Sequence, residues 1–166
     1  MKPTIIGSAF EQWTFDVLKP YIKKLGATKW NGNPDFYFDL NNHVILLECK
    51  CFQFRDGQKG RQSKPGYLCL GDSQIKSLKK MKNGLGGDNE IYLVVGISFD
   101  NYDIIPVVVE LEEALRHAMK WKDGLKRKWI SMNWLIKQKP FRTWIGEVFK
   151  VEPKDIVFPE FRSYLK

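Results

Sequence analysis

Apolar residues repeat at two different spacings along the chain, and the change in spacing separates predicted helices from predicted strands. Over residues 8–25 they recur every three or four positions, which is the period of an amphipathic helix. Ser8 is a favourable N-cap residue and Gly26 commonly follows a helix end, so the pattern predicts a helix from Ser8 to about residue 25. Pro20 lies inside this period and predicts either a kink or two abutting helices.

Two apolar-rich runs, residues 35–40 and 43–52, predict the strands of a β-hairpin. They flank Asn41 and Asn42, and asparagine tolerates the positive φ that a two-residue hairpin turn requires. The turn length therefore fixes which residues of the two strands face each other.

In this register Asp35 faces Glu48, because the numbers of facing residues must have a constant sum. Side chains alternate between the two sides of a strand, so Glu48 and Lys50 share a side, and cross-strand pairing places Asp35 on that same side. The hairpin therefore brings two carboxylates and one amine together.

Two directly opposed carboxylates destabilise a sheet unless a cation lies between them. A bound divalent metal at Asp35 and Glu48 is one resolution, and hard oxygen ligands without a cysteine or histidine cluster favour Mg²⁺ or Mn²⁺ over zinc. The alternative is a solvated sheet edge at which Lys50 alone neutralises both acids.

The remaining patterned segments continue the alternation of strand and helix. They predict a short strand over 67–70, a helix from a cap at 71–73 to about residue 83 and a strand buried on both faces over 91–99. A further strand is predicted over 104–109, where Pro106 indicates either a sheet edge or a bulge. The predicted fold class is α/β, with a mixed central β-sheet flanked by helices. The glycine-rich stretch at 84–89 does not match a dinucleotide-binding fingerprint, so no nucleotide cofactor is expected.

Length and composition indicate one soluble domain over residues 1–166, with a core at about 7–110 and a basic, Trp-rich C-terminal extension at about 111–166. The apolar fraction is 43%, and no long uncharged apolar run predicts a signal peptide or membrane span. We therefore expect a cytoplasmic protein without membrane contact. Cys49, Cys51 and Cys69 form no even disulfide framework and are expected to be buried reduced thiols.

The net charge of +8 favours an acidic partner such as nucleic acid, and the charge is unevenly distributed. Residues 52–66 have four basic residues and one acid, so this glycine-bearing segment is either a DNA-contacting arm or merely a solvated loop. Its candidate DNA-binding residues are Arg55, Lys59, Arg61 and Lys64.

Residues 116–142 contain nine basic residues and one acid, and four tryptophans are interleaved with or follow them. Lys126, Arg127 and Lys128 are the candidate DNA-binding residues of this segment. The tryptophans either stack on opened bases or pack into the core, and we expect phosphate contact by the lysines and packing for most of the tryptophans. These are Trp121, Trp129, Trp134 and Trp144.

The sequence Pro34-Asp35, twelve residues and then Glu48-Cys49-Lys50 resembles the signature of the PD-(D/E)XK nuclease superfamily. With GSAFEQW ahead of it and YLCLGDSQIKSL behind it, the order is similar to archaeal Holliday-junction resolvases and, more loosely, to RecU-type resolvases. The resemblance covers about residues 7–97 and implies a restriction-endonuclease-like core.

The resemblance also implies roles for individual residues. Asp35, Glu48 and the backbone carbonyl of Cys49 would bind Mg²⁺ or Mn²⁺, with Glu11 assisting, and Lys50 would act on the attacking water. Glu11 has a second interpretation as the capping-box partner of Ser8. Related nucleases often have a glutamine near the metal site, which gives Gln74 a possible accessory role besides simple helix capping.

The expected function is that of a metal-dependent DNA endonuclease, and the resemblance favours a structure-selective one of the Holliday-junction resolvase type. Its partner would be double-stranded or branched DNA, its working unit a homodimer and its products a 5′-phosphate and a 3′-hydroxyl. Two alternatives remain: a sequence-specific restriction or homing endonuclease of the same fold, and a non-catalytic DNA-binding protein.

Overall fold

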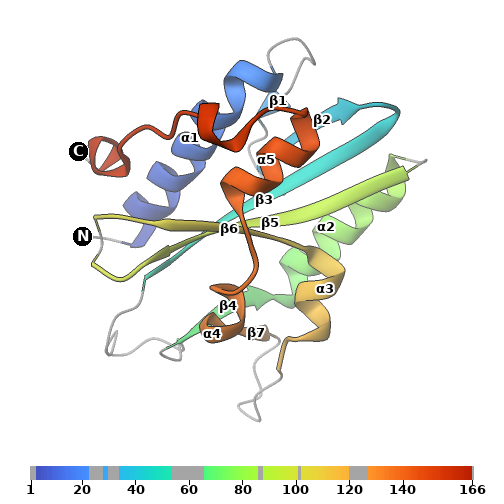
Figure 1. Ribbon diagram of the computed structural model, residues 1–166. Helices are drawn as coiled ribbons and strands as arrows, with labels where there is room; N and C mark the ends of the chain where they lie inside the picture. The colour runs from blue at the N-terminus through green and yellow to red at the C-terminus, as the bar shows by residue number, and fades with distance from the viewer. Residues whose placement is uncertain are drawn as a thin grey trace.

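A computed structural model places a mixed β-sheet between two groups of helices (Figure 1). It describes residues 3–22, 28–29, 34–53, 66–85, 88–100, 102–119 and 127–165. The helices are α1 (Pro3–Ile22), α2 (Asp72–Gly84), α3 (Leu111–Arg116), α4 (Met132–Leu135), α5 (Phe141–Phe149) and the 3₁₀ turns η2 (Pro153–Asp155) and η3 (Phe161–Tyr164). The strands are β1 (Thr28–Lys29), β2 (Phe36–Leu40), β3 (His43–Gln53), β4 (Tyr67–Gly71), β5 (Asp88–Ser98), β6 (Ile105–Glu110), β7 (Arg127–Ser131) and β8 (Lys139–Pro140).

The main sheet has the strand order β1-β2-β3-β5-β6-β8. Strands β3 and β5 are parallel over the full length of β3, and the other neighbours in this sheet are antiparallel. Strands β4 and β7 form a separate antiparallel ribbon. This architecture confirms the predicted α/β class with a mixed central sheet flanked by helices.

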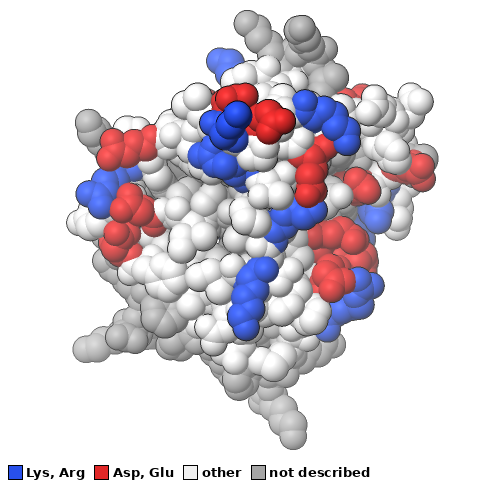
Figure 2. All heavy atoms as spheres, in the orientation of Figure 1, with Lys and Arg blue, Asp and Glu red and all other residues white. Residues whose placement is uncertain are grey.

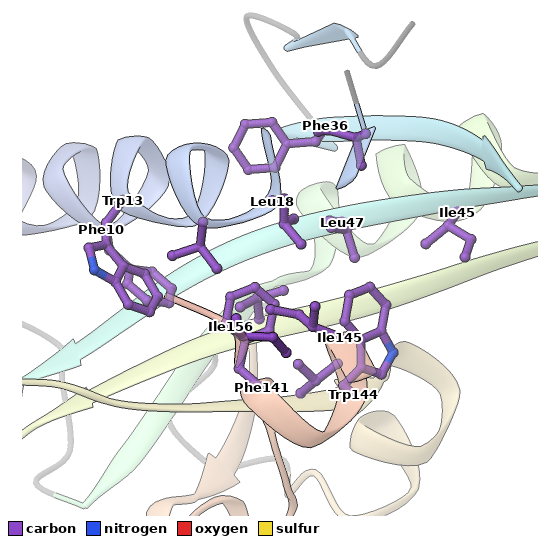
Figure 3. Packing of buried hydrophobic residues seen from close by; sticks show 14 of the residues in the cluster. Phe10, Trp13, Leu18, Phe36, Ile45, Leu47, Phe141, Trp144, Ile145 and Ile156 are labelled. Carbon is purple, nitrogen blue, oxygen red and sulfur yellow. The ribbon is translucent and has the colours of Figure 1, made fainter. Parts of the chain in front are cut away.

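Each face of the sheet has its own hydrophobic core, because successive side chains of a strand point to opposite faces. On β3, Ile45 and Leu47 pack with α1 and α5, whereas Leu46 packs on the opposite face with α2, α3 and the β4–β7 ribbon. Figure 3 shows the first core, in which side chains of α1, β2 and α5 meet over β3. Strand β5 is buried on both faces, as predicted.

The hairpin adopts the predicted register, with Leu40 opposite His43 and Phe36 opposite Leu47. Asn41 and Asn42 have φ values of 50° and 68°, as a two-residue hairpin turn requires. One boundary differs, because β2 begins at Phe36 and Asp35 lies one residue before it.

Helix α1 begins five residues earlier than predicted, at Pro3, so Ser8 lies inside the helix and is not its N-cap. The capping-box interpretation of Glu11 is therefore wrong. The physical reason is tertiary, since Ile6 is buried in the first core and packing extends the helix across Gly7. The helix continues through Pro20 as one element.

The N-cap of α2 is Gly71, the last residue of β4, which lies within the cap predicted at 71–73. One other boundary differs from the sequence prediction. Strand β5 starts at Asp88, three residues before the apolar run, because its polar first residues pair with the start of β3 from His43 onward. Backbone pairing is indifferent to side-chain polarity, which explains why the apolar pattern misses these residues.

The C-terminal third is built into both cores. Helix α5 supplies Phe141, Trp144 and Ile145 to the first core, and β8 pairs with β6 at the edge of the main sheet. Trp129 is also buried and Trp134 packs against the second core, so packing is confirmed for these tryptophans, whereas Trp121 lies outside the described residues. Within the described ranges, no helix has the length and apolar content needed to cross a membrane.

Candidate active site

The centre of the candidate site is the edge of β3 just beyond Leu47, where pairing with the first residue of β2 stops. In a two-residue hairpin the alternate residues Ile45 and Leu47 exchange backbone hydrogen bonds with β2, so the backbone groups of Cys49 point in the same direction. At Cys49 the partner strand has ended, and its N–H donates a hydrogen bond to Oδ2 of Asp35 at 2.7 Å. The hairpin thus holds the Asp35 carboxylate beside the main chain of Cys49.

Glu48 lies on the side of β3 that faces α2, and only 3% of it is exposed. Its Oε1 atom accepts a hydrogen bond from Nε2 of Gln74 at 2.9 Å. Nζ of Lys50 lies 3.7 Å from the same oxygen, with 25% of the Lys50 side chain exposed. Glu48 is therefore held between the strand and α2, with Lys50 at the solvent side.

Burial raises the pKa of both acids. Desolvation raises the pKa of Asp35 to about 6, a nearby Glu11 carboxyl acts in the same direction, and the Cys49 N–H and Lys50 oppose the shift. Desolvation and the Asp35 charge raise the pKa of Glu48 to about 8, against the opposing effects of Lys50 and Gln74. The two carboxyls therefore repel each other and titrate as a pair.

Glu11 reaches this pair from α1, on the other side of the hairpin. It shares a side-chain hydrogen bond with Asp35, and its charge contributes to the raised pKa of that residue. The structure thus brings together Asp35, Glu48 and Lys50, which the hairpin register placed on one side, with Glu11 and Gln74, which only the resemblance implied.

Thr14 is a residue that the sequence analysis missed. It is fully buried, its Oγ1 donates to the carbonyl of Phe10 at 2.8 Å, and its side chain is hydrogen-bonded to the thiol of Cys49. Burial raises the pKa of that thiol well above its usual range, so it remains protonated. Thr14 lies three positions after Glu11, and this spacing on one helix face was the available signal.

The donor set suits a hard divalent cation. Within the described residues, no group of three or more His, Cys, Asp and Glu side chains is arranged as a complete metal site. Mg²⁺ nevertheless keeps several water ligands and needs only one or two carboxylates, and two buried, mutually repelling acids are the charge that such an ion would neutralise. Asp35, Glu48 and the Cys49 carbonyl therefore fit Mg²⁺ or Mn²⁺ better than zinc.

The predicted DNA-contacting residues lie only partly within the described chain. Arg127 and Lys128 are half-buried on β7, where they pair with Gly71 and Leu70 of β4 rather than with the hairpin. The other candidates, Arg55, Lys59, Arg61, Lys64 and Lys126, lie outside the described residues.

Positive and negative side chains are interleaved on the face drawn in Figure 2, including the region over α3. This face therefore does not present a uniform positive surface. The sequence concentrates basic residues instead in 54–65 and 120–126, which together contain seven Lys or Arg and two Asp. The first of these segments starts directly after β3, four residues beyond Lys50, and the second ends where β7 begins.

Comparison with known proteins identifies a similar fold. No family model matches the sequence, and no curated protein matches it either. Among solved structures, the chain is similar to Hjc, a Holliday junction resolvase from the archaeal hyperthermophile Archaeoglobus fulgidus, with 16% sequence identity and a TM-score of 0.53. The match covers 88% of this chain and 97% of that chain. At this identity the likeness establishes a resolvase-like fold.

Proposed function

We propose that this protein is a Mg²⁺-dependent DNA endonuclease that hydrolyses phosphodiester bonds, with selectivity for branched DNA such as a four-way junction. The observation that carries the proposal is the convergence of Asp35, Glu48 and Lys50 at the end of the hairpin, with Glu48 buried and Asp35 half-buried. Taking two acids out of water costs stability, and carboxyls with pKa values raised in this way cluster at functional sites.

Asp35, Glu48 and the carbonyl of Cys49 would hold the metal, and Glu11 would assist directly or through water. A bound Mg²⁺ would supply Lewis-acid stabilisation of the phosphate and lower the pKa of a bound water. Gln74 fixes the orientation of Glu48 by donating to its Oε1. The hydrogen bond from the Cys49 N–H does the same for Asp35.

Lys50 is the proposed catalytic residue that contacts the reacting water and phosphate. Its amine lies at the partly exposed side of the pair, next to the oxygen of Glu48 that Gln74 also contacts. From there it can orient or deprotonate the attacking water and neutralise charge that develops on the phosphate in the transition state.

Three features support DNA as the substrate: the resolvase-like fold, the net charge of +8 and the basic segment that directly follows β3, the strand of Glu48 and Lys50. Cutting two strands of a junction needs two active sites, so we propose a symmetric homodimer as the working unit. A cytoplasmic location beside the nucleoid would follow from this substrate.

The test offers purified protein a synthetic four-way junction, the linear duplex arms of that junction and a long natural DNA, each with Mg²⁺ or with chelator. Symmetric nicks in the junction only, dependent on Mg²⁺, are the expected result. Discrete cuts in linear DNA would favour the sequence-specific alternative. Tight DNA binding without cleavage in Mg²⁺ or Mn²⁺ would refute the proposed nuclease activity and would favour a non-catalytic DNA-binding protein.

A further inference from the structure

A hollow of about 410 Å³ lies between α2, α3 and β7, on the side of α2 away from the acidic pair. Its charged lining residues are Asp72, Lys76, Lys79, Glu112, Arg116 and Lys128. The charged residues from α2, Asp72, Lys76 and Lys79, are four and three positions apart and therefore share one face of the helix. Gln74 is two positions from Lys76 and points from another face of the helix toward Glu48. The hollow is therefore separate from the candidate active site.

The charges in the hollow are unbalanced. Lys79 lies 3.8 Å from Glu112 across the hollow, and Arg116 pairs with Glu113 on its own helix. Among the residues that the structure describes, neither Lys76 nor Lys128 forms an ion pair. Asp72 forms none there either, so two ammonium groups and one carboxylate face the hollow outside the ion pairs, and the excess of positive charge favours an anion.

The apolar part of the lining narrows the choice of anion. Ile75 is buried and Leu115 is half-buried, and both contribute to the hollow between the charged groups. A free inorganic phosphate would make no use of this apolar surface. A backbone phosphate with its attached deoxyribose uses both kinds of surface, since the sugar has an apolar face.

We propose that this hollow binds a phosphate of the DNA backbone at a position flanking the cut, with Lys76 and Lys128 as the contacting residues. The inference rests on the proposed function for its substrate class. Helix α2 separates the hollow from Glu48, and a helix is roughly 10–12 Å across with its side chains. A phosphate bound in the hollow would therefore be a neighbour of the phosphate that is cut, and not that phosphate itself.

The test compares DNA affinity of the double variant Lys76→Gln, Lys128→Gln with that of wild type, by fluorescence anisotropy of a labelled four-way junction in EDTA over a salt series. Loss of two phosphate contacts is expected to weaken binding roughly tenfold and to lower the salt slope by about 2. Lys80→Gln is the matched control, because Lys80 is an exposed lysine of α2 outside the hollow. It should change the affinity less than about twofold.

A second variant tests the same inference in the opposite direction. Glu112→Gln removes an acid from the hollow and should tighten binding, which a misfolded protein could not do. The proposal is overturned if the double variant and Lys80→Gln behave alike. It is also overturned if inorganic phosphate binds wild type at the hollow while DNA affinity is unaffected by the double variant. Because the assay needs no cleavage, a protein that binds DNA without cutting it contradicts the proposed function and not this inference.

Discussion

At the residue scale, the buried Glu48 carboxyl makes stability depend on pH. In metal-free protein its pKa is about 8, against 4.5 for an ordinary glutamate, so between these values the folded state binds a proton that the unfolded chain releases. The free energy of unfolding of the wild type should therefore fall as pH rises through this window, on the order of 3 kcal/mol in all. Glu48→Gln should lose most of this dependence. Urea unfolding in EDTA at pH 5 and pH 8 measures the free energy of unfolding of both proteins. An equal change between the two pH values in wild type and Glu48→Gln would contradict this prediction.

Mg²⁺ is expected to reverse this trend in the wild type. Metal ligands must be deprotonated, and at pH 8 a bound Mg²⁺ would offset the cost of placing two carboxylate charges at the site. Mg²⁺ should therefore raise the melting temperature more at pH 8 than at pH 5. Thermal unfolding with Mg²⁺ or chelator measures the difference. Glu48→Gln should show little response at either pH, and an equal response in that variant would exclude Glu48 as a ligand.

The hydrogen bond from Gln74 gives a second prediction at this scale. Gln74→Ala removes a donor that lowers the pKa of Glu48, so the buried acid should hold its proton to higher pH. Cleavage at pH 7 is expected to fall about 10-fold or more, with the pH–rate profile displaced to alkaline pH. Ser73→Ala, at an exposed neighbouring position, is the control. A uniform loss at every pH would point to a structural role only.

The sequence predicted the register of the hairpin correctly, and with it the closeness of Asp35 and Glu48, because turn length and strand alternation are local rules. It could not predict that Asp35 lies outside the strand and accepts a hydrogen bond from the Cys49 N–H, since this depends on where β2 begins. Gln74 was expected near the site only by resemblance. Its contact with Glu48 joins residues that are 26 positions apart.

At the element scale, the contact between α1 and the sheet positions Glu11. A Cβ atom at Gly96 of β5 would lie 2.6 Å from the ring of Phe10, which is fully buried and precedes Glu11 on α1. Gly96→Ala should therefore force α1 away from the sheet and destabilise the protein by about 2 kcal/mol. Gly7→Ala is the matched control, because nothing lies within 4 Å of its Cβ position, and it should stabilise α1 by about 0.5–1 kcal/mol. Denaturant unfolding distinguishes the two, and equal effects would contradict the packing argument.

The hairpin and helix α1 differ in how well the sequence predicted their boundaries. The hairpin was predicted correctly because its turn residues adopt the conformation that the residue type allows. The start of α1 was wrong because Ser8 carries a valid local capping signal that the burial of Ile6 overrides. Local sequence signals therefore determined the hairpin turn, whereas tertiary packing determined the residue at which α1 begins.

At the scale of the whole molecule, the basic residues of the segment after β3 should dominate the salt dependence of DNA binding. Replacing Arg55, Lys59, Arg61 and Lys64 with glutamine should lower the salt slope by about 3–4 and weaken binding to junction and duplex alike. Anisotropy titrations over a salt series measure this. Lys154→Gln, at an exposed position on η2, is the control. An unchanged slope in the four-site variant would show that this segment does not contact phosphates.

The central claim is that the hairpin forms a metal-dependent catalytic centre, and Lys50 tests it most directly because its proposed role is in the chemistry and not in holding the DNA. The measurement is the single-turnover cleavage rate of a four-way junction with saturating protein in Mg²⁺, for wild type and Lys50→Ala, with junction affinity measured in parallel. Lys50→Ala is expected to lower the rate by about 10³-fold or more while changing affinity less than about threefold. Full cleavage by Lys50→Ala, or no Mg²⁺-dependent cleavage by the wild type, would contradict the account.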